Sequence, residues 1–592
     1  METTNARMSI WEDGTRLLVH RNGGTKVLIA NVYDVLPSPA RSFPADSLRR
    51  HLRWGRSLIK GVFVIFLIVS ASQGGCSHAT LPESAKSEFS KQSRWLDADV
   101  QAVSVGCASD PATPAWAMEN PFFSVREIQA NVNFLADARL GGRMTDTPGN
   151  VETARYIAGQ FADAGLQSAG DGGRWFQSFP VPILKVPSRR CVLRVSDQPP
   201  LELHKDYSPI ALGTNGAFDG PLVFAGYGLN NRIRRYNDYE SLSVRGAVVM
   251  VLAGEPHNES GQSRWALKGK WTRLAGLGYK IRKAADAGAV AVLIVAPETI
   301  LPDPESLHYV YGNGTGPIPA IRICRKLADR LLSESGTDQS IASLVAKIEA
   351  TRKPVSFAVG TRIRGLVDLR DGVGQNVVGI LPADARADAR ERPRVLVVGA
   401  HYDHLPIGGA KAKDHGLGVR PGADDNASGI AAMIQLAKAL ARTPGRKADI
   451  VFVAFGAEEI GFCGSKYYVN HPVRALEDTY AMINIDQVGR MRGSRVAVIG
   501  NVLENPLGPA LKQASAQCPG LKIVKIPFIS KNRWSDQAPF ARSDVPTLFF
   551  FTGFHRDYHR RTDTAEKINL PGVAAVARFA YGMMRSLDAR GK

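Results

Sequence analysis

Short apolar runs alternate with helical patterns over most of the chain after residue 123. Runs of strand length include VLVVGAH at 395–401, DIVFVAF at 449–455 and AMINI at 481–485. Between the first two runs, apolar residues recur at helical spacing in GIAAMIQLAKAL at 429–440. Strands that alternate with helices are typical of α/β proteins. We therefore predict an α/β fold with a mixed, mostly parallel sheet flanked by helices.

Histidines and acidic residues stand where these apolar runs end, or in the loops that follow them. Open α/β sheets place functional groups just beyond the carboxyl ends of their strands, so these side chains are expected to meet at one edge. In chain order they are His401, Asp424, Asp425, Glu458, Glu459, Asp486, His555 and His559.

This combination of side chains suits a divalent metal. Zn²⁺ binds imidazole nitrogen and carboxylate oxygen, and two neighbouring ions need a carboxylate that bridges them. A further carboxylate beside the activated water can act as the general base. Any one of these residues alone could simply cap a strand or a helix, but their collection in this order favours a metal site.

Five segments together resemble the M28 family of zinc peptidases, most of which are aminopeptidases with two zinc ions. The segments are HYDHL, GADDNASG, AEEIG, NIDQVGR and YHRRTDTAEKI. The resemblance covers about residues 124–587, interrupted by an insertion. It implies a zinc-exopeptidase fold of the phosphorylase/hydrolase type and two Zn ions as cofactors.

The resemblance also implies roles for the matching residues. The expected metal ligands are His401, Asp425, Glu459, Asp486 and His559, with Asp425 bridging both ions. Glu458 would be the general base, and Tyr558 would stabilise the oxyanion.

Four neighbouring residues receive supporting assignments. Asp403 could accept a hydrogen bond from His401 and orient its ring, although an ordinary turn residue fits equally well. Asp424 is expected to cap or hydrogen-bond, because Asp425 matches the bridging position better. His404 and His555 are expected to be structural or to face the substrate rather than to bind metal.

Composition and patterning divide the chain into further regions. Apolar runs such as RGAVVMVLAGEP and AGAVAVLIVAPET resemble an inserted, mainly β protease-associated domain. This insertion could limit the length of the substrate, or it could be purely structural. The predicted regions are 1–48, an unassigned extension; 49–76, a signal peptide; 77–122, a linker; 123–205, the first part of the peptidase domain; 206–350, the inserted domain; and 351–592, the catalytic part.

The predicted signal consists of a basic stretch, an apolar run at 61–71 and small residues before Cys76. The apolar run is too short for a membrane span, which needs about 20 residues. We predict export to the periplasm or cell envelope, either as a lipoprotein attached through Cys76 or as a secreted protein. Because a signal normally begins close to the first residue, translation is expected to start near residue 48.

The first ordered helix is predicted to begin after Ser124. The sequence Ser124-Val-Arg-Glu127 is a capping box, and apolar residues follow it at helical spacing. The apolar positions Ala154, Ile157, Ala158 and Phe161 predict a second amphipathic helix that ends near Gly165. Both helices should pack on the catalytic sheet despite their distance in sequence.

The resulting functional prediction is an exported zinc aminopeptidase that cleaves peptides with Glu458 as the general base. The alternatives within the fold are a carboxypeptidase, a dipeptidase or a glutaminyl cyclase, and the alternative of another class is a receptor-like module without catalysis. The formal net charge of +19 indicates a basic surface, but without a nucleic-acid motif it does not predict nucleic-acid binding.

Overall fold

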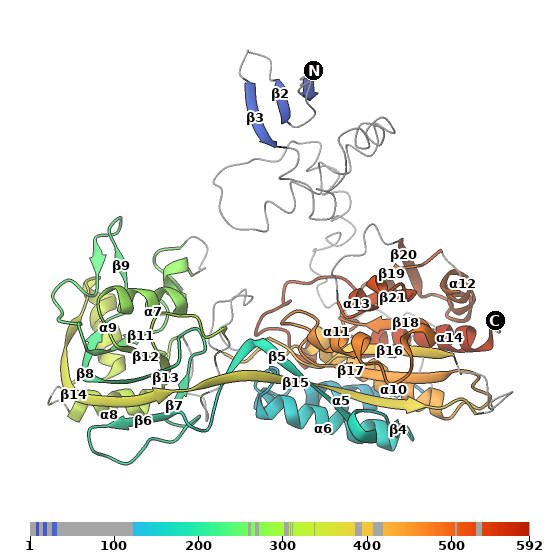
Figure 1. Ribbon diagram of the computed structural model, residues 1–592, viewed down its shortest axis with the longest axis horizontal. Coiled ribbons are helices and arrows are strands. Elements are labelled where there is room, and N and C mark those ends of the chain that lie inside the picture. Colours follow the sequence, from blue (N-terminus) through green and yellow to red (C-terminus); the bar gives the residue numbers. More distant parts are fainter. Residues whose placement is uncertain are drawn as a thin grey trace, which may run out of the picture. The chain divides into compact units, whose positions relative to one another are not determined.

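A computed structural model gives the structure of the protein (Figure 1). Its residues cluster into two compact units, Met1–Val105 and Gly106–Lys592. The predicted signal at 49–76, including Cys76, and the linker as far as residue 121 lie outside the described residues. The described ranges are 7–10, 16–20, 26–31, 122–258, 262–266, 271–300, 307, 310, 312–334, 336, 338–384, 394–405, 418–503, 506–527 and 535–590.

The first unit contains a small antiparallel sheet in the segment to which the sequence analysis assigned no structure. Its strands pair in the order β1-β2-β3. They are β1 (Arg7–Ile10), β2 (Arg16–His20) and β3 (Lys26–Asn31).

The second unit contains a nine-stranded sheet with the order β20-β19-β21-β18-β16-β17-β15-β4, and β5 also pairs with β15. The four central strands, β17, β16, β18 and β21, run parallel, whereas β15 and β19 join this centre antiparallel. The predicted mixed α/β fold is confirmed, and β20 at the edge also pairs with β19 in parallel. The strands are β4 (Gln167–Ser168), β5 (Phe176–Pro187), β15 (Leu369–Leu381), β16 (Val395–His401), β17 (Asp449–Phe455), β18 (Thr479–Ile485), β19 (Arg495–Gly500), β20 (Lys522–Pro527) and β21 (Thr547–Phe551).

Helices cover this sheet, and apolar residues are buried on both of its faces. Every residue of β16 and β17 is buried, as expected for parallel strands covered on both faces. Ile128, Ile434 and Val576 come from three different helices and belong to the same apolar core as Phe452 of β17. The helices are α5 (Val125–Leu135), α6 (Pro148–Asp163), α10 (Gly429–Ala441), α11 (Cys463–Asn470), α12 (Leu507–Gln517), α13 (Gln537–Arg542) and α14 (Leu570–Ala589).

The predicted start of the first helix is confirmed, but the capping box is only half formed. Ser124 is the N-cap of α5, and its hydroxyl accepts a hydrogen bond from the Glu127 backbone N–H at 3.2 Å. The Glu127 carboxylate does not return to Ser124. It accepts hydrogen bonds from Gln435 at 2.9 Å and Lys438 at 2.7 Å on α10. The cap therefore also joins α5 to the catalytic part.

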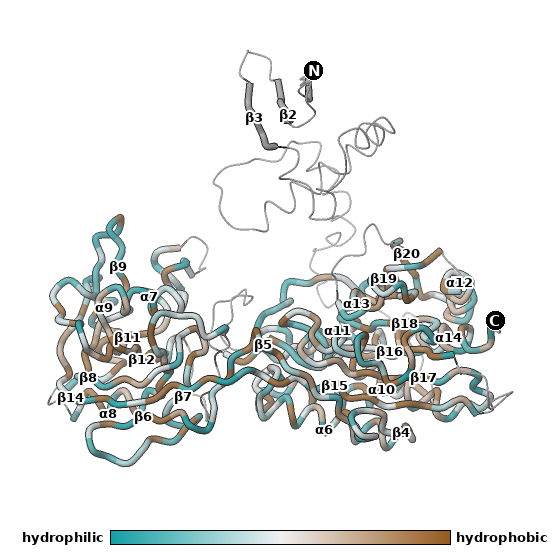
Figure 2. Tube along the Cα trace, viewed as in Figure 1, coloured by the Kyte–Doolittle hydropathy of each residue, from teal (hydrophilic) through white to brown (hydrophobic). Residues whose placement is uncertain are grey.

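A second, seven-stranded sheet has the order β6-β14-β8-β11-β12-β13-β7. Its inner strands β11 and β12 are wholly apolar and buried, and Figure 2 shows them in brown. Because β6 and β14 flank the predicted insertion at 206–350, the sheet extends beyond those bounds at both ends. Its likeness to a protease-associated domain stays a prediction. The elements are β6 (Val192–Val195), β7 (Tyr207–Pro209), β8 (Gly216–Ala225), β9 (Asn230–Asn231), β10 (Tyr236–Asn237), β11 (Val248–Leu252), α7 (Leu277–Asp286), β12 (Ala291–Val295), β13 (Ala320–Ile323), α8 (Arg325–Glu334), α9 (Ile341–Thr351) and β14 (Ser356–Val367).

A buried lysine makes the stability of this region depend on pH. Burial lowers the pKa of Lys280 on α7 to about 7, and its ammonium group donates to the Tyr227 carbonyl. Between pH 7 and the usual lysine pKa of about 10.5, the unfolded chain holds a proton that the folded chain lacks. Stability should therefore rise with pH across this window, by up to about 1.4 kcal/mol per pH unit.

Substitution of Lys280 tests this effect. In Lys280→Met, the rise in the free energy of unfolding between pH 7.5 and 9.5, measured by urea unfolding, is expected to flatten. Lys283→Met on the same helix is the control, since Lys283 forms a partly exposed ion pair with Asp286. An equal rise in both variants would contradict the assignment.

None of the helices in the described ranges combines the length and the apolar character that a membrane crossing requires.

Candidate active site

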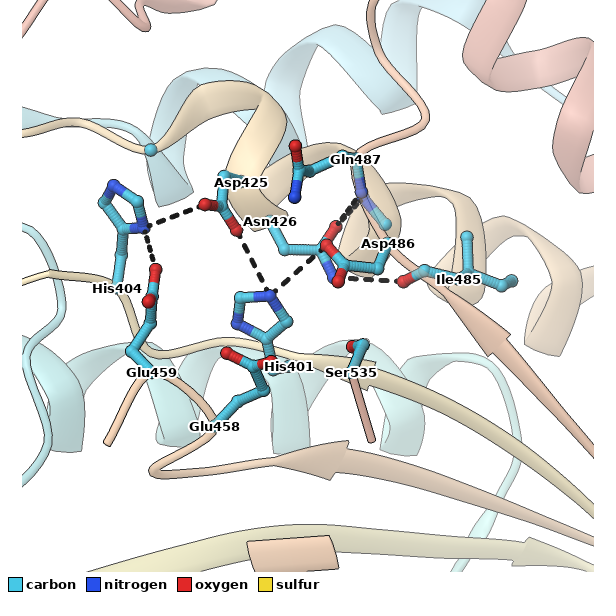
Figure 3. A network of polar contacts seen from close by, with 12 residues as sticks. His401, His404, Asp425, Asn426, Glu458, Glu459, Ile485, Asp486, Gln487 and Ser535 are labelled. Atoms are coloured by element: carbon cyan, nitrogen blue, oxygen red, sulfur yellow. Dashed lines mark hydrogen bonds and ion pairs between the residues drawn. The ribbon is translucent and has the colours of Figure 1, made fainter. Parts of the chain in front are cut away.

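The parallel centre of the sheet brings the predicted residues to one edge. His401 is the last residue of β16, paired with Phe455 at the end of the neighbouring strand β17. Asp486 directly follows β18, on the other side of β16. The loop segment Ala423–Ser428 carries Asp425 and leads into α10. Residues from separate segments thus meet where the parallel strands end, as the sequence predicts (Figure 3).

The first group of possible metal ligands is His401, Asp425 and Asp486. The His401 Nε2 atom lies 3.2 Å from Asp425 Oδ1 and 3.3 Å from Asp486 Oδ1. The other ring nitrogen, Nδ1, lies 3.0 Å from the backbone carbonyl of Asp403. Donation from Nδ1 to that carbonyl makes Nε2 the nitrogen that faces the two carboxylates and that would bind a metal after losing its proton.

A second group shares Asp425 with the first. The Asp425 Oδ2 atom lies 3.1 Å from His559 Nε2. The same His559 nitrogen lies 3.5 Å from Glu459 Oε1. His404 belongs to this group as well, with Nδ1 at 3.0 Å from Glu459 Oε1. Asp425 therefore offers one oxygen to each group, the arrangement that a bridging carboxylate needs.

The charges of the protein groups also suit metal ions. Burial alone would lower the pKa of His401, but the carboxylates of Glu458 and Asp486 raise it well above its usual value. Burial opposes ionisation of Asp425, yet hydrogen bonds from His401 and His559 hold its pKa well below the ordinary range. So many buried carboxylates need a compensating positive charge. Imidazole and carboxylate donors fit zinc at both groups.

Glu458 and Tyr558 lie beside the two groups. Burial raises the pKa of Glu458 well above its usual value; His401 opposes this rise, and the carboxylate of Glu459 adds to it. Burial and the nearby carboxylates of Asp425 and Glu459 raise the pKa of Tyr558, so its hydroxyl keeps its proton. Each side chain is thus adjacent to the possible ligands without being a member of either group.

Of the two roles considered for Asp403, the structure shows that of a turn carboxylate. Its backbone carbonyl, rather than its carboxylate, contacts the His401 ring, and carboxylate Oδ1 lies 4.0 Å from His401 Nδ1. The carboxylate instead accepts backbone hydrogen bonds from Glu458 at 2.9 Å and Glu459 at 3.3 Å. Asp403 therefore holds the turn that presents both glutamates.

Asp424 is a hydrogen-bonding residue, as expected. Its Oδ1 atom accepts from the Ser428 hydroxyl at 3.1 Å, and Oδ2 lies 3.1 Å from Nε2 of His555. His555 therefore contacts Asp424 and belongs to neither of the two groups.

Asp563 supports the bridging residue and was not predicted. Its Oδ2 atom accepts backbone hydrogen bonds from Asp424 at 2.9 Å and Asp425 at 3.2 Å. Its Oδ1 atom accepts from Arg490 at 2.9 Å. The only signal in the sequence is its place in the segment RRTDT, close after His559.

Arg143 is fully buried and ties the loops around the site together. Its guanidinium donates to the backbone carbonyls of Tyr402 at 2.9 Å, Pro421 at 2.6 Å and Gly422 at 3.0 Å, and also to Leu135. Tyr402 precedes His404 in one loop, and Pro421 and Gly422 precede Asp425 in another. The predicted packing of the first peptidase segment on the catalytic part is thereby confirmed.

Loss of the Arg143 guanidinium should destabilise the protein. Arg143→Met leaves several buried carbonyls without their donor, and we expect a loss of about 3–5 kcal/mol, seen as a lower midpoint of thermal unfolding. The exposed Arg139 nearby is the control, since Arg139→Met is expected to change stability by less than about 0.5 kcal/mol. Similar midpoints for both variants would contradict the anchoring role.

Comparison with known proteins finds similarity over the residues that build this site. Residues 376–584 match the family model of Peptidase family M28. Aminopeptidase YwaD of Bacillus subtilis is 26% identical over 298 residues, which cover 49% of this chain and 55% of YwaD. The probable lipoprotein aminopeptidase LpqL of Mycobacterium tuberculosis is 23% identical over 365 residues, which cover 56% of this chain and 60% of LpqL. The chain thus matches less than two thirds of either relative.

Among solved structures, BSAP, a zinc aminopeptidase from Bacillus subtilis, is 20% identical with a TM-score of 0.46, covering 78% of this chain and 94% of that chain.

Proposed function

Because residues 376–584 match the family model of Peptidase family M28, we propose that the protein is a zinc-dependent aminopeptidase of that family. The observation that carries the proposal is the position of Asp425, which offers one oxygen to each of two groups of buried metal-ligand side chains. His401 and Asp486 would hold one ion with it, and Glu459 and His559 the other. The names of the relatives YwaD and LpqL support an aminopeptidase.

The protein's own side chains supply proton transfer and charge stabilisation. Bound zinc ions would polarise the scissile carbonyl and acidify water. Glu458 takes the proton from the attacking water and passes it to the departing amine, a role that suits a glutamate with a raised pKa. Tyr558 keeps its hydroxyl proton and can donate a hydrogen bond to the oxyanion. The Asp403 carboxylate accepts a hydrogen bond from the Glu458 backbone N–H and so keeps Glu458 in place.

The proposal is tested by turnover of the zinc-loaded protein on matched peptides with free and with blocked amino termini. Cleavage of the free-amino peptides alone, abolished by a chelator, is the expected result. Cleavage of the blocked peptides would instead indicate a carboxypeptidase or an endopeptidase. No cleavage of either set, with metal bound, would favour a cyclase or a receptor-like role.

We also propose export to the cell envelope, because the signal-like segment 49–76 ends in Cys76. The lipoprotein named among the relatives makes lipid attachment the first form to test. Labelling with a fatty acid in cells should mark the wild-type chain and not Cys76→Ala. Equal labelling of both would reject attachment at Cys76, and an unprocessed chain in the cytoplasm would reject export.

A further inference from the structure

His404 has no role in the proposed mechanism, yet it is buried against the second group of ligands. It lies in the loop just after β16, and its side chain is fully buried. Among the described residues its Nε2 atom has no hydrogen-bond partner, and its Nδ1 atom faces the carboxylate of Glu459. A buried imidazole that is directed at carboxylates in this way is placed as a neighbouring metal ligand would be.

The distances around His404 are those of donors that share one ion. Its Nδ1 atom lies 3.0 Å from Glu459 Oε1 and 3.8 Å from Asp425 Oδ2 (Figure 3). His559 Nε2 approaches the same two oxygens at 3.5 and 3.1 Å. Donor atoms that each lie about 2.0–2.2 Å from one zinc ion are at most about 4.4 Å apart. All four distances meet this limit.

The surroundings hold the His404 ring in this direction. Gly422 lies against the ring, and a Cβ atom at that position would come within 2.5 Å of His404 Cδ2. Gly422 also has a positive φ of 58°, a conformation that favours glycine, and its carbonyl accepts from Arg143. The close approach of this backbone leaves the ring packed with Nδ1 toward the two carboxylates.

We propose that His404 is a fourth protein ligand of the second metal ion, an inference that rests on the proposed two-metal function. The first ion would then have three protein ligands, His401, Asp425 and Asp486. The second would have four, Asp425, Glu459, His559 and His404. The second ion is therefore held more tightly, and the first keeps more positions open for water and substrate.

Zinc titration of the metal-free full-length protein tests the inference. Wild type is compared with three variants, His404→Gln, His559→Gln and His471→Gln. Glutamine keeps a polar side chain in place of the imidazole. His471 is an exposed histidine stacked on Tyr467, so its replacement controls for loss of an imidazole elsewhere. His404→Gln should weaken the binding of one zinc ion by more than about 100-fold. Loss of a residue that only contacts a metal ligand weakens metal binding by at most about that factor. His471→Gln should weaken the binding of neither ion.

The variants separate failure of this inference from failure of the two-metal site. If His559→Gln loses an ion while His404→Gln weakens binding by less than about 100-fold, His404 is not a ligand and the two-metal site stands. If His559→Gln also keeps both ions with unchanged affinity, the two-metal site itself is wrong.

Zinc X-ray absorption at saturating metal supplies a second readout that does not depend on affinity. The wild type should show three imidazoles for every two zinc ions, from His401, His404 and His559, and His404→Gln should show two. An unchanged imidazole signal in His404→Gln would overturn the proposal even if its zinc affinity fell.

Discussion

Glu458→Gln is expected to lower kcat by about 10²–10⁴-fold while leaving zinc binding intact, because glutamine keeps the shape of the side chain but cannot accept the proton. Glu458 is outside both ligand groups, so its charge is not needed to hold either ion. Steady-state kinetics on a free-amino peptide, together with zinc content by atomic absorption, measure the two effects separately.

The exposed Glu152 provides the matched control for this substitution. Glu152→Gln should retain the activity of the wild type. Loss of zinc together with activity in Glu458→Gln would assign Glu458 to metal binding instead, and retained activity would remove it from the proton-transfer role.

Asp425→Asn is expected to reduce the binding of both zinc ions, because the amide removes the negative charge that both groups share. Each ion loses one of its two carboxylate ligands, so zinc content after dialysis should fall from about two to below one per chain, with activity lost in parallel. The neighbouring Asp424→Asn is the control, since Asp424 contributes to neither group. It should keep both ions at saturating zinc.

Loss of a single ion in Asp425→Asn would show that the aspartate serves one site and does not bridge. Retention of both ions at wild-type affinity would exclude Asp425 as a ligand altogether.

The sequence predicts what depends on local pattern. The strands that end near His401, Glu458 and Asp486 stand out as apolar runs, and the rule for parallel sheets is enough to bring their ends together. The helix after Ser124 is marked by its cap. These features depend on a few consecutive residues, so no tertiary information is needed to find them.

Contacts between distant segments could not be predicted in this way. The Glu127 carboxylate leaves its local capping partner because Gln435 and Lys438 lie within reach only in the folded chain. Asp563 contacts the Asp425 backbone across 138 positions, and Arg143 reaches Gly422 across 279. Nothing in the local sequence at either end of such a contact specifies its partner.

The assignments of Asp403 and His404 depend on atoms rather than residue types. A sequence gives the aspartate after His401 but not whether its carbonyl or its carboxylate faces the ring. It likewise gives the second histidine of HYDHL but not the direction in which Nδ1 points, which only the packing against Gly422 determines.

The core of the second unit also joins the first helix and α14 of that unit. The ring of Phe123, just before α5, packs edge-on against that of Tyr581 in α14, with 5.9 Å between the ring centroids, although the two residues are 458 positions apart in sequence. At a synthesis rate of about 5–20 residues per second, roughly 20–90 s pass between the appearance of these two partners. During that interval the apolar side of α5 has no α14 to pack against, so the core closes only when the last helix has been made. Assembly of the metal site, whose His559 lies shortly before that helix, is therefore among the last events in the maturation of the protein.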